Sequence, residues 1–152
     1  MCIRDSTTHR KAFGTTIRDH SLMQNTLGDL VIESEAATLL GFRVSQAVDD
    51  AKQKESEKLL NRILVPIAKF WNCRRVSSVT LEALECHGGM GYIEDQRIAR
   101  FYREAPLNSI WEGTASIMGL DVMRTMKWNP DSLDTLLEEI KLAKGTNRYL
   151  DA

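Results

Sequence analysis

Hydrophobic and polar positions alternate at helical spacing over two long stretches of the chain. In the first stretch, from Ser21 to Ala51, apolar and small residues recur at steps of three and four and share one face: Met23, Leu27, Leu30, Ser34, Ala37, Gly41, Val44, Val48 and Ala51. This spacing predicts one long amphipathic helix. Its small residues would let another helix approach closely.

A charged segment from Asp49 to Glu57 predicts a turn, and a second long helix is expected after it. The apolar face of this helix is formed by Leu60, Ile63, Ile67, Phe70, Cys73, Ser77, Leu81 and Leu84. Pro66 lies inside this pattern and is expected either to kink the helix or to mark its true start. The sequence His87-Gly88-Gly89 is expected to end the helix, as glycine does at a C-terminal cap.

The remaining segments are shorter. In chain order they predict a turn at 10–14, a loop with one short helix at 93–106, a helix that starts at Thr114 or Ser116, and a turn at 129–132. A last amphipathic helix is expected to be ended by Gly145, and its apolar face is formed by Leu133, Leu136, Leu137 and Ile140. Two long and two shorter helices joined by short turns predict an all-α fold, an antiparallel four-helix-bundle-like domain.

Composition agrees with a helical domain of ordinary character. The 152 residues suffice for one domain, 43% are hydrophobic and 27% charged, and only three prolines interrupt them. The formal net charge of −1 gives no reason to expect nucleic acid or an anionic membrane as an obligatory partner. No apolar run is long enough to cross a bilayer.

Cysteine usage and the first residues bear on location and boundaries. Cys2, Cys73 and Cys86 are an odd number without C-x-x-C spacing, so we interpret them as structural thiols of a reducing, cytoplasmic protein. Residues 1–6 lack the apolar region of a secretory signal and differ in character from the rest of the chain. We therefore expect residues 1–8 to be a non-native or disordered leader and 9–152 to form the domain.

One acidic residue stands in a setting that suits proton transfer. The stretch 108–116, Asn-Ser-Ile-Trp-Glu-Gly-Thr-Ala-Ser, places Glu112 between Trp111 and a helix start. Desolvation by the indole would raise the pKa of the carboxyl and the helix dipole would lower it. A general base needs a carboxylate tuned in this way. The same local pattern also fits an ordinary polar residue at a helix start.

Motifs on both sides of this stretch carry a family resemblance. Residues 87–92 read His-Gly-Gly-Met-Gly-Tyr, residues 100–106 read Arg-Phe-Tyr-Arg-Glu-Ala-Pro, and Ile-Trp-Glu-Gly-Thr comes next. Their order and spacing resemble the flavin-binding C-terminal region of the acyl-CoA dehydrogenases, and Trp111 before the Glu is similar to the AidB-like branch. The resemblance covers the chain from His9 onward and implies that the family's N-terminal helical and middle β-domains lie outside it.

The resemblance implies an activity and its partners. The larger enzyme would bind FAD and oxidise an acyl-CoA to its 2,3-enoyl-CoA, with FAD at the subunit interface of a homotetramer built as a dimer of dimers. Glu112 aligns with the catalytic base, which removes the α-proton of the acyl thioester while a β-hydrogen leaves as hydride to the flavin. Such a proton is far less acidic than a carboxylic acid, so the base must be poised by desolvation.

Two hydroxyl residues are candidates for FAD binding. Thr114 and Ser116 fall at a predicted helix N-terminus, where free N–H groups and the dipole favour a phosphate. The resemblance implies contact with the pyrophosphate or ribityl part of FAD. Ordinary N-capping is the alternative, and the two roles are compatible. Many family members carry a longer amide at the position of Ser116.

Other candidates belong to a FAD held mainly by the neighbouring subunit. Gly88 and Gly89 would let backbone approach its adenine end. Glu85 replaces a common glutamine, and beside a pyrophosphate this acid must point away or bond to sugar hydroxyls. Arg10 and Phe13 match an Arg-x-x-Phe-Gly turn whose arginine reaches the FAD diphosphate, as a guanidinium fork can. An ordinary surface arginine is the alternative.

Other polar residues are interpreted as structural. Arg100 and Arg103 are expected to pair with Glu104 or Glu94. The three histidines, His9, His20 and His87, are too scattered in sequence for a metal site. No Walker or Rossmann glycine pattern occurs.

Two other function classes stay open. The first is an AidB-like, DNA-associated protective protein. The tail residues Lys141, Lys144 and Arg148 would be its basic surface, although they are only mildly basic as a group. The second is a helical module that only oligomerises, for which an exposed apolar groove is unfavourable.

Overall fold

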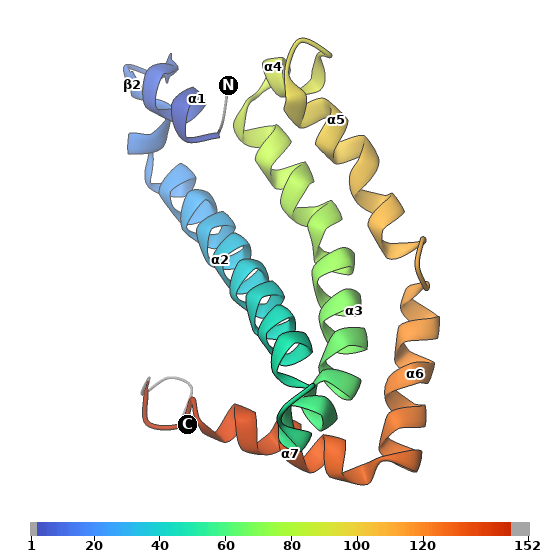
Figure 1. Ribbon diagram of the computed structural model, residues 1–152. Helices are drawn as coiled ribbons and strands as arrows, with labels where there is room; N and C mark the ends of the chain where they lie inside the picture. The colour runs from blue at the N-terminus through green and yellow to red at the C-terminus, as the bar shows by residue number, and fades with distance from the viewer. Residues whose placement is uncertain (1–2, 147–152) are drawn as a thin grey trace. The chain divides into compact units, whose positions relative to one another are not determined.

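The computed structural model describes residues 3–146, and almost all of its regular structure is helical (Figure 1). The elements in chain order are α1 (Ile3–His9), β1 (Lys11–Ala12), β2 (Thr15–Thr16), η1 (Ile17–Asp19), α2 (Ser21–Asp50), α3 (Glu55–Cys86), α4 (Gly89–Tyr92), α5 (Arg97–Glu104), η2 (Ala105–Ser109), α6 (Ala115–Trp128) and α7 (Pro130–Lys141). The strands form one antiparallel pair, with Lys11 opposite Thr16 and Ala12 opposite Thr15. The predicted all-α fold class is confirmed. Within the described residues, no helix is long and apolar enough to cross a membrane.

The helices divide into two compact units, and both long helices contribute to each. The first unit comprises Met1–Leu39 and Trp71–Glu112, and the second comprises Leu40–Phe70 and Gly113–Ala152. The predicted turn between α2 and α3 spans residues 51–54, close to the charged segment that indicated it.

Small side chains form the core of the first unit. Ala83, Cys86, Ala99 and Ala105 are buried there, together with Ser6, Thr7 and His87. The two long helices of this unit are joined by polar contacts. Arg75 pairs with Glu33, and the Asn72 amide donates to the carbonyl of Ala37 at 3.2 Å. Ala37 was one of the small residues expected to permit close approach, and here a side chain reaches its backbone.

The second unit has an aliphatic core on α3, formed by Leu60, Ile63, Leu64 and Ala68, with Ala47 of α2 also buried. Such burial supplies most of the favourable free energy of packing. Around it, Arg43 donates to Glu57 at 2.9 Å and to Glu139 at 2.5 Å, which ties α2 to α3 and α7.

A second ion pair in this unit joins α3 to α6. Arg62 donates two hydrogen bonds to Asp121, at 2.7 and 2.8 Å. The hydrogen bonds from Arg62 hold the pKa of the Asp121 carboxyl below its ordinary value, and those from Arg43 do the same for Glu139. Both arginine forks are bidentate across helices, so they fix the register between helices as well as adding attraction.

Several sequence-based boundaries need correction. Residues 3–8 were expected to be disordered or non-native; Ile3–His9 is instead helical, with Ser6 and Thr7 buried, and whether these residues are native stays a prediction. Pro66 does not start a helix, because α3 begins at Glu55 and continues through it. The last helix starts at Pro130, since proline suits a first helical position, and it ends at Lys141, before Gly145. Cys2 lies outside the described residues.

Candidate functional site

The predicted cofactor residues Arg10, Phe13, Glu85, Gly88 and Gly89 all belong to the first unit, and Glu112 is its last residue. Thr114 and Ser116 belong to the second unit.

Arg10 is engaged with the end of α3. Its guanidinium donates to the carbonyl of Cys86 at 2.8 Å and to the carbonyl of His87. The last carbonyls of a helix lack intrahelical partners, so this arginine satisfies two of them. The expected role of Arg10 at a FAD diphosphate stays a prediction. A link between two segments 76 residues apart could not be inferred from local sequence.

The three glycines after α3 have different surroundings. Gly88 has a φ of +63°, and a Cβ on it would lie 2.5 Å from an Arg10 nitrogen. A Cβ on Gly91 would overlap the carbonyl oxygen of Leu84. Gly89 alone of the three has open space around it. Gly88 and Gly91 are therefore required by the fold of this unit, and Gly89 is the one that a ligand can approach.

Phe13 stands at the tip of the β1–β2 hairpin. It has a φ of +53°, is followed by Gly14 at +86°, and its side chain is 97% exposed. Holding a non-glycine residue in this conformation costs about 1–2 kcal/mol. The ring contacts His20 edge-on, with centroids 6.2 Å apart.

A groove of about 440 Å³ opens beside this ring, and its walls are Phe13, Ile17, His20, Leu22, Met23, Thr26, Glu82, Glu85 and Cys86. Glu85 thus lines the same groove as Phe13, and two carboxylates border an otherwise mostly apolar space. The thiol of Cys86 is buried, and burial raises its pKa, so it is a poor nucleophile.

Glu112 occupies the second strained position. Its φ is +53°, and Gly113 follows at +100°. Within residues 3–146 its exposed carboxylate makes no ion pair or hydrogen bond, whereas the two preceding glutamates are paired: Glu94 with Arg103, and Glu104 with Arg100 at 2.8 Å. Those two pairs confirm the structural role expected for the arginines. Trp111 is 54% exposed, so it does not bury the carboxylate as the sequence suggested.

Helix α6 begins directly after this turn. Thr114 is its N-cap, and the Thr114 hydroxyl accepts from the N–H of Ile117 at 3.4 Å. The predicted capping role is confirmed for Thr114. Ser116 is exposed in the first turn, close to the N–H groups that α6 leaves unpaired. An anion would be favoured at this end of the helix.

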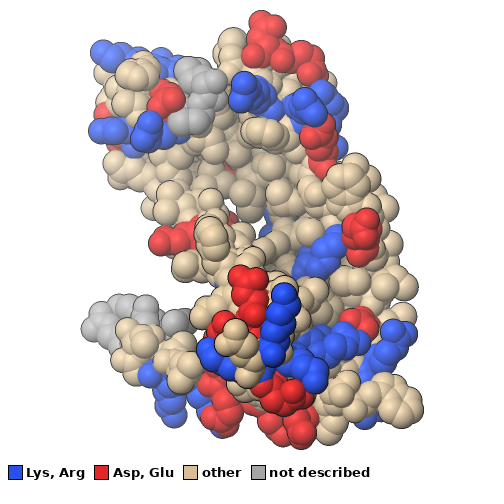
Figure 2. Space-filling model, viewed as in Figure 1, with Lys and Arg blue, Asp and Glu red and all other residues tan. Residues whose placement is uncertain are grey.

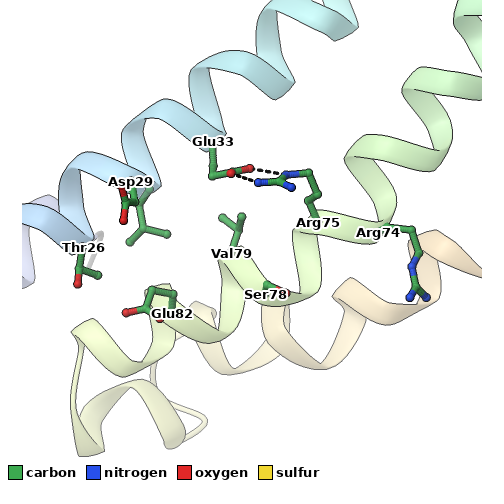
Figure 3. Close-up of a pocket in the computed structure, with 9 residues that line it drawn as sticks. Thr26, Asp29, Glu33, Arg74, Arg75, Ser78, Val79 and Glu82 are labelled. Carbon is green, nitrogen blue, oxygen red and sulfur yellow. Dashed lines mark hydrogen bonds and ion pairs between the residues drawn. The ribbon is translucent and has the colours of Figure 1, made fainter. Parts of the chain in front are cut away.

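A polar groove that sequence reasoning missed lies between α2 and α3 of the first unit (Figure 3). It has a volume of about 540 Å³ and is lined by Thr26, Asp29, Leu30, Glu33, Arg74, Arg75, Ser78, Val79 and Glu82. The Glu33–Arg75 pair crosses it, and Arg74 extends away from that pair. Arg75 also stacks on Trp71, 4.6 Å from the ring centroid. The groove contains none of the predicted site residues.

Charged side chains of both signs share the face of the molecule that Figure 2 shows. On the face that Figure 2 shows, lysine and arginine are interspersed with aspartate and glutamate. Lys141 is already paired with Glu138 at 2.6 Å, and Arg148 lies outside the described residues. Among the described residues, no three His, Cys, Asp or Glu side chains are grouped as metal ligands.

Comparisons with known proteins agree with the motifs. The family described as "Acyl-CoA dehydrogenase, C-terminal domain" matches residues 3–127. The putative acyl-CoA dehydrogenase AidB of Escherichia coli is 40% identical over 145 residues, which cover 93% of this chain and 26% of that protein. The mitochondrial short-chain specific acyl-CoA dehydrogenase of Bos taurus is 31% identical over 114 residues, 75% of this chain and 26% of that protein.

The fold is shared with solved structures. Caenorhabditis elegans ACDH-11, solved in complex with C11-CoA, superposes with a TM-score of 0.88 at 26% identity and covers 98% of this chain and 26% of its own. This chain therefore spans about a quarter of the length of the proteins it resembles. The resemblance inferred from residues 87–92, 100–106 and 108–116 is confirmed.

Proposed function

Because this chain belongs to the acyl-CoA dehydrogenase family, we propose that it is the C-terminal helical domain of a larger FAD-dependent enzyme that oxidises an acyl-CoA to its 2,3-enoyl-CoA. In this proposal Glu112 is the base that removes the α-proton. FAD supplies the hydride acceptor for the β-hydrogen, and acyl-CoA is the substrate.

The observation that carries the proposal is the state of Glu112. It is an exposed carboxylate without a partner among the described residues, and it closely precedes Thr114, the N-cap of α6. A carboxylate committed to an arginine would be a weak base, because the ion pair stabilises its charged form. Glu112 is free of such a pair, so a substrate α-proton can reach it. The desolvation it needs would come from substrate and from parts of the enzyme outside this chain.

The cofactor fits the chemistry of the remaining candidates. Thr114 and Ser116 offer hydroxyls and helix N–H groups to a phosphate. Gly89 offers unobstructed backbone, and Phe13 offers an exposed ring beside the groove that Glu85 lines. At that groove, Glu85 suits sugar hydroxyls, which donate to a carboxylate, better than it suits phosphate. Arg10 would need to keep its bonds to α3 while presenting its remaining N–H groups to a diphosphate.

Assembly into a homotetramer, with FAD at the subunit interface, is part of the same proposal. Large apolar side chains remain exposed in both units: Phe13 in the hairpin, and on helices Leu22, Ile32, Phe42, Leu120, Met123 and Trp128 among others. Soluble proteins rarely leave so much apolar surface open without a partner. On the face that Figure 2 shows, the interspersed charges favour such contacts over DNA, which would require a basic surface.

The test uses the full-length protein with FAD bound, mixed with acyl-CoA without oxygen. We expect the parent protein to lose its oxidised-flavin absorbance and Glu112→Gln to lose it at least about 100-fold more slowly, since general base catalysis contributes about 10²–10⁴-fold. Glu55→Gln, an exposed carboxylate at the start of α3, is the matched control and should react as the parent does. Parental bleaching in Glu112→Gln would remove Glu112 from the role of base.

A further inference from the structure

The Glu112–Gly113 turn has no regular hydrogen-bonded framework of its own. Before it, the N–H groups of Ile110 and Trp111 both bond to the carbonyl of Leu107, at 2.9 and 3.1 Å. After it, the N–H of Met118 bonds to the carbonyl of Thr114 at 2.9 Å. The two residues between these anchors are both left-handed, at φ +53° and +100°. A strained residue persists only where its surroundings determine it.

The side chain that approaches Gly113 most closely is Met118. A Cβ on Gly113 would overlap the terminal methyl of Met118 and would lie 3.8 Å from its sulfur and 3.7 Å from a methyl of Ile117. The thioether of Met118, one turn into α6, therefore covers the Cα of Gly113. The other left-handed glycine beside a strained residue, Gly14, has nothing within 4 Å.

We infer that Met118 is a positioning residue for Glu112: by packing on Gly113, it holds the left-handed Glu112–Gly113 pair that presents the carboxylate to the acyl-CoA α-carbon. This inference rests on the proposed function. The flexible, unbranched thioether fills the irregular space over a glycine that a branched side chain fills less well. A rotation of Gly113 toward a right-handed conformation would change this contact, because Met118 packs where a Cβ on Gly113 would stand. Removal of the contact lets the turn relax and redirects the carboxylate.

Loss of the Met118 contact should affect the rate of the chemical step, which is removal of the α-proton. A misplacement of about 1 Å at a reacting group costs up to about 10²-fold in rate. Loss of the Met118 contact should therefore slow proton removal without weakening the binding of acyl-CoA or FAD, which other residues provide. Slower proton removal also makes that step more fully rate-limiting, so the deuterium isotope effect should increase.

The experiment measures flavin reduction by stopped flow in the full-length, FAD-loaded protein, over a range of acyl-CoA concentrations. For Met118→Ala we expect a limiting rate lower by about 10-fold or more, with FAD content and acyl-CoA affinity near the parent values. The isotope effect with α-deuterated acyl-CoA should rise. Met118→Leu keeps the side-chain volume but loses the terminal methyl. It should lower the limiting rate as Met118→Ala does, but by a smaller factor.

Met126→Leu on the same helix is the matched control, because Met126 is 43% exposed and lies farther along α6 from the turn; we expect parental kinetics. Parental limiting rates in both Met118 variants would overturn the inference, and so would a fall in affinity at unchanged limiting rate. If Met118→Ala fails to retain FAD, the limiting rate and acyl-CoA affinity of Met118→Leu are used in its place to test the inference. The Glu112→Gln variant distinguishes this inference from the proposed function. If flavin bleaching is slow in Glu112→Gln but the Met118 variants reduce the flavin at the parental rate, only the positioning role of Met118 is wrong. If bleaching in Glu112→Gln is as fast as in the parent, both the base assignment and the positioning role are wrong.

Discussion

The two strained turns of this molecule have the same backbone form and different causes. Phe13–Gly14 and Glu112–Gly113 are each a non-glycine residue at φ +53° followed by a left-handed glycine. The first pair closes a hairpin whose strands pair on both sides, and a two-residue hairpin loop of type I′ needs positive φ at both positions. The second pair joins a 3₁₀ segment to the N-cap of α6, with no paired strands to impose its shape.

The comparison shows that strain can be maintained either by backbone hydrogen bonds or by a side chain. In the hairpin, backbone pairing dictates the turn, and the space around Gly14 is empty. At Glu112 the turn depends on Met118 packed over Gly113. Side-chain substitutions should therefore disturb the second turn more than the first.

The largest expected effect on stability is a difference between alanine substitutions at Gly113 and at Gly14. Both Gly113→Ala and Gly14→Ala incur the left-handed cost of about 1–2 kcal/mol, which the lower freedom of alanine in the unfolded chain offsets by about 0.5–1 kcal/mol, but only the Ala at 113 also overlaps Met118, which adds about 1–3 kcal/mol. We expect Gly113→Ala to destabilise the protein by about 2–3 kcal/mol and Gly14→Ala by about 1 kcal/mol or less. Urea unfolding of both variants measures this.

A double mutant sharpens the same contrast. Addition of Met118→Ala should recover at least about 1 kcal/mol in the Gly113→Ala background and nothing in the Gly14→Ala background, because only the first pair is in contact. Equal losses in the two glycine variants, or a Met118→Ala effect that simply adds to both, would contradict the packing explanation.

Acid should weaken the ion pair that joins α3 to α6, the helix that carries Met118. The pKa of Asp121 on α6 is lowered by its hydrogen bonds from Arg62. Its folded pKa lies below the ordinary value of 3.8, so the stabilisation is complete above that value and disappears as the pH falls through the lowered pKa. The pair is partly exposed, which limits its contribution to about 1 kcal/mol or less.

Unfolding of the parent and of Asp121→Asn, compared at neutral pH and near pH 3, measures that contribution. The two proteins should differ at neutral pH and converge in acid. A difference that persists unchanged in acid would show that the Asn variant is destabilised for a reason other than lost charge. Gly14→Ala should add to Asp121→Asn without coupling, since the hairpin lies in the other unit.

The smallest expected effect on stability comes from placing glycine at the two left-handed non-glycine residues, which relieves their backbone strain. Phe13→Gly and Glu112→Gly each remove a left-handed non-glycine residue, a gain of about 1–2 kcal/mol that the greater freedom of glycine in the unfolded chain offsets by about 0.5–1 kcal/mol. Each variant should be more stable than the parent by about 0.5 kcal/mol in urea unfolding. A clear loss of stability at either position would mean that its side chain makes stabilising contacts that outweigh the strain.

Features set by local spacing were predictable from the sequence. The periodicity of residues 21–51 identified α2, and the spacing of Arg100 and Glu104 identified their ion pair. Thr114 was recognisable as an N-cap because capping depends on one hydroxyl before a helix. The charged turn between the two long helices was also near its observed position.

Features that depend on distant residues were not predictable. Arg10 satisfies carbonyls at the end of α3, and Arg75 reaches Glu33 from 42 residues away, which no local pattern indicates. The helix at Ile3–His9 was missed because a single short segment gives too few periods to detect. Likewise, the sequence identified Glu112 by its motif but gave no indication of its backbone conformation or of Met118 over Gly113.

Proton exchange at the acyl α-carbon tests the role of Glu112 most directly, because it isolates proton removal from hydride transfer. A 3-thia-acyl-CoA has sulfur in place of the β-carbon and so carries no hydrogen to transfer; its α-hydrogens can be followed by proton NMR in D₂O with the full-length, FAD-loaded protein. We predict exchange in the parent and an exchange at least about 100-fold slower in Glu112→Gln. Equal exchange rates in the two proteins would contradict the assignment of Glu112 as the base.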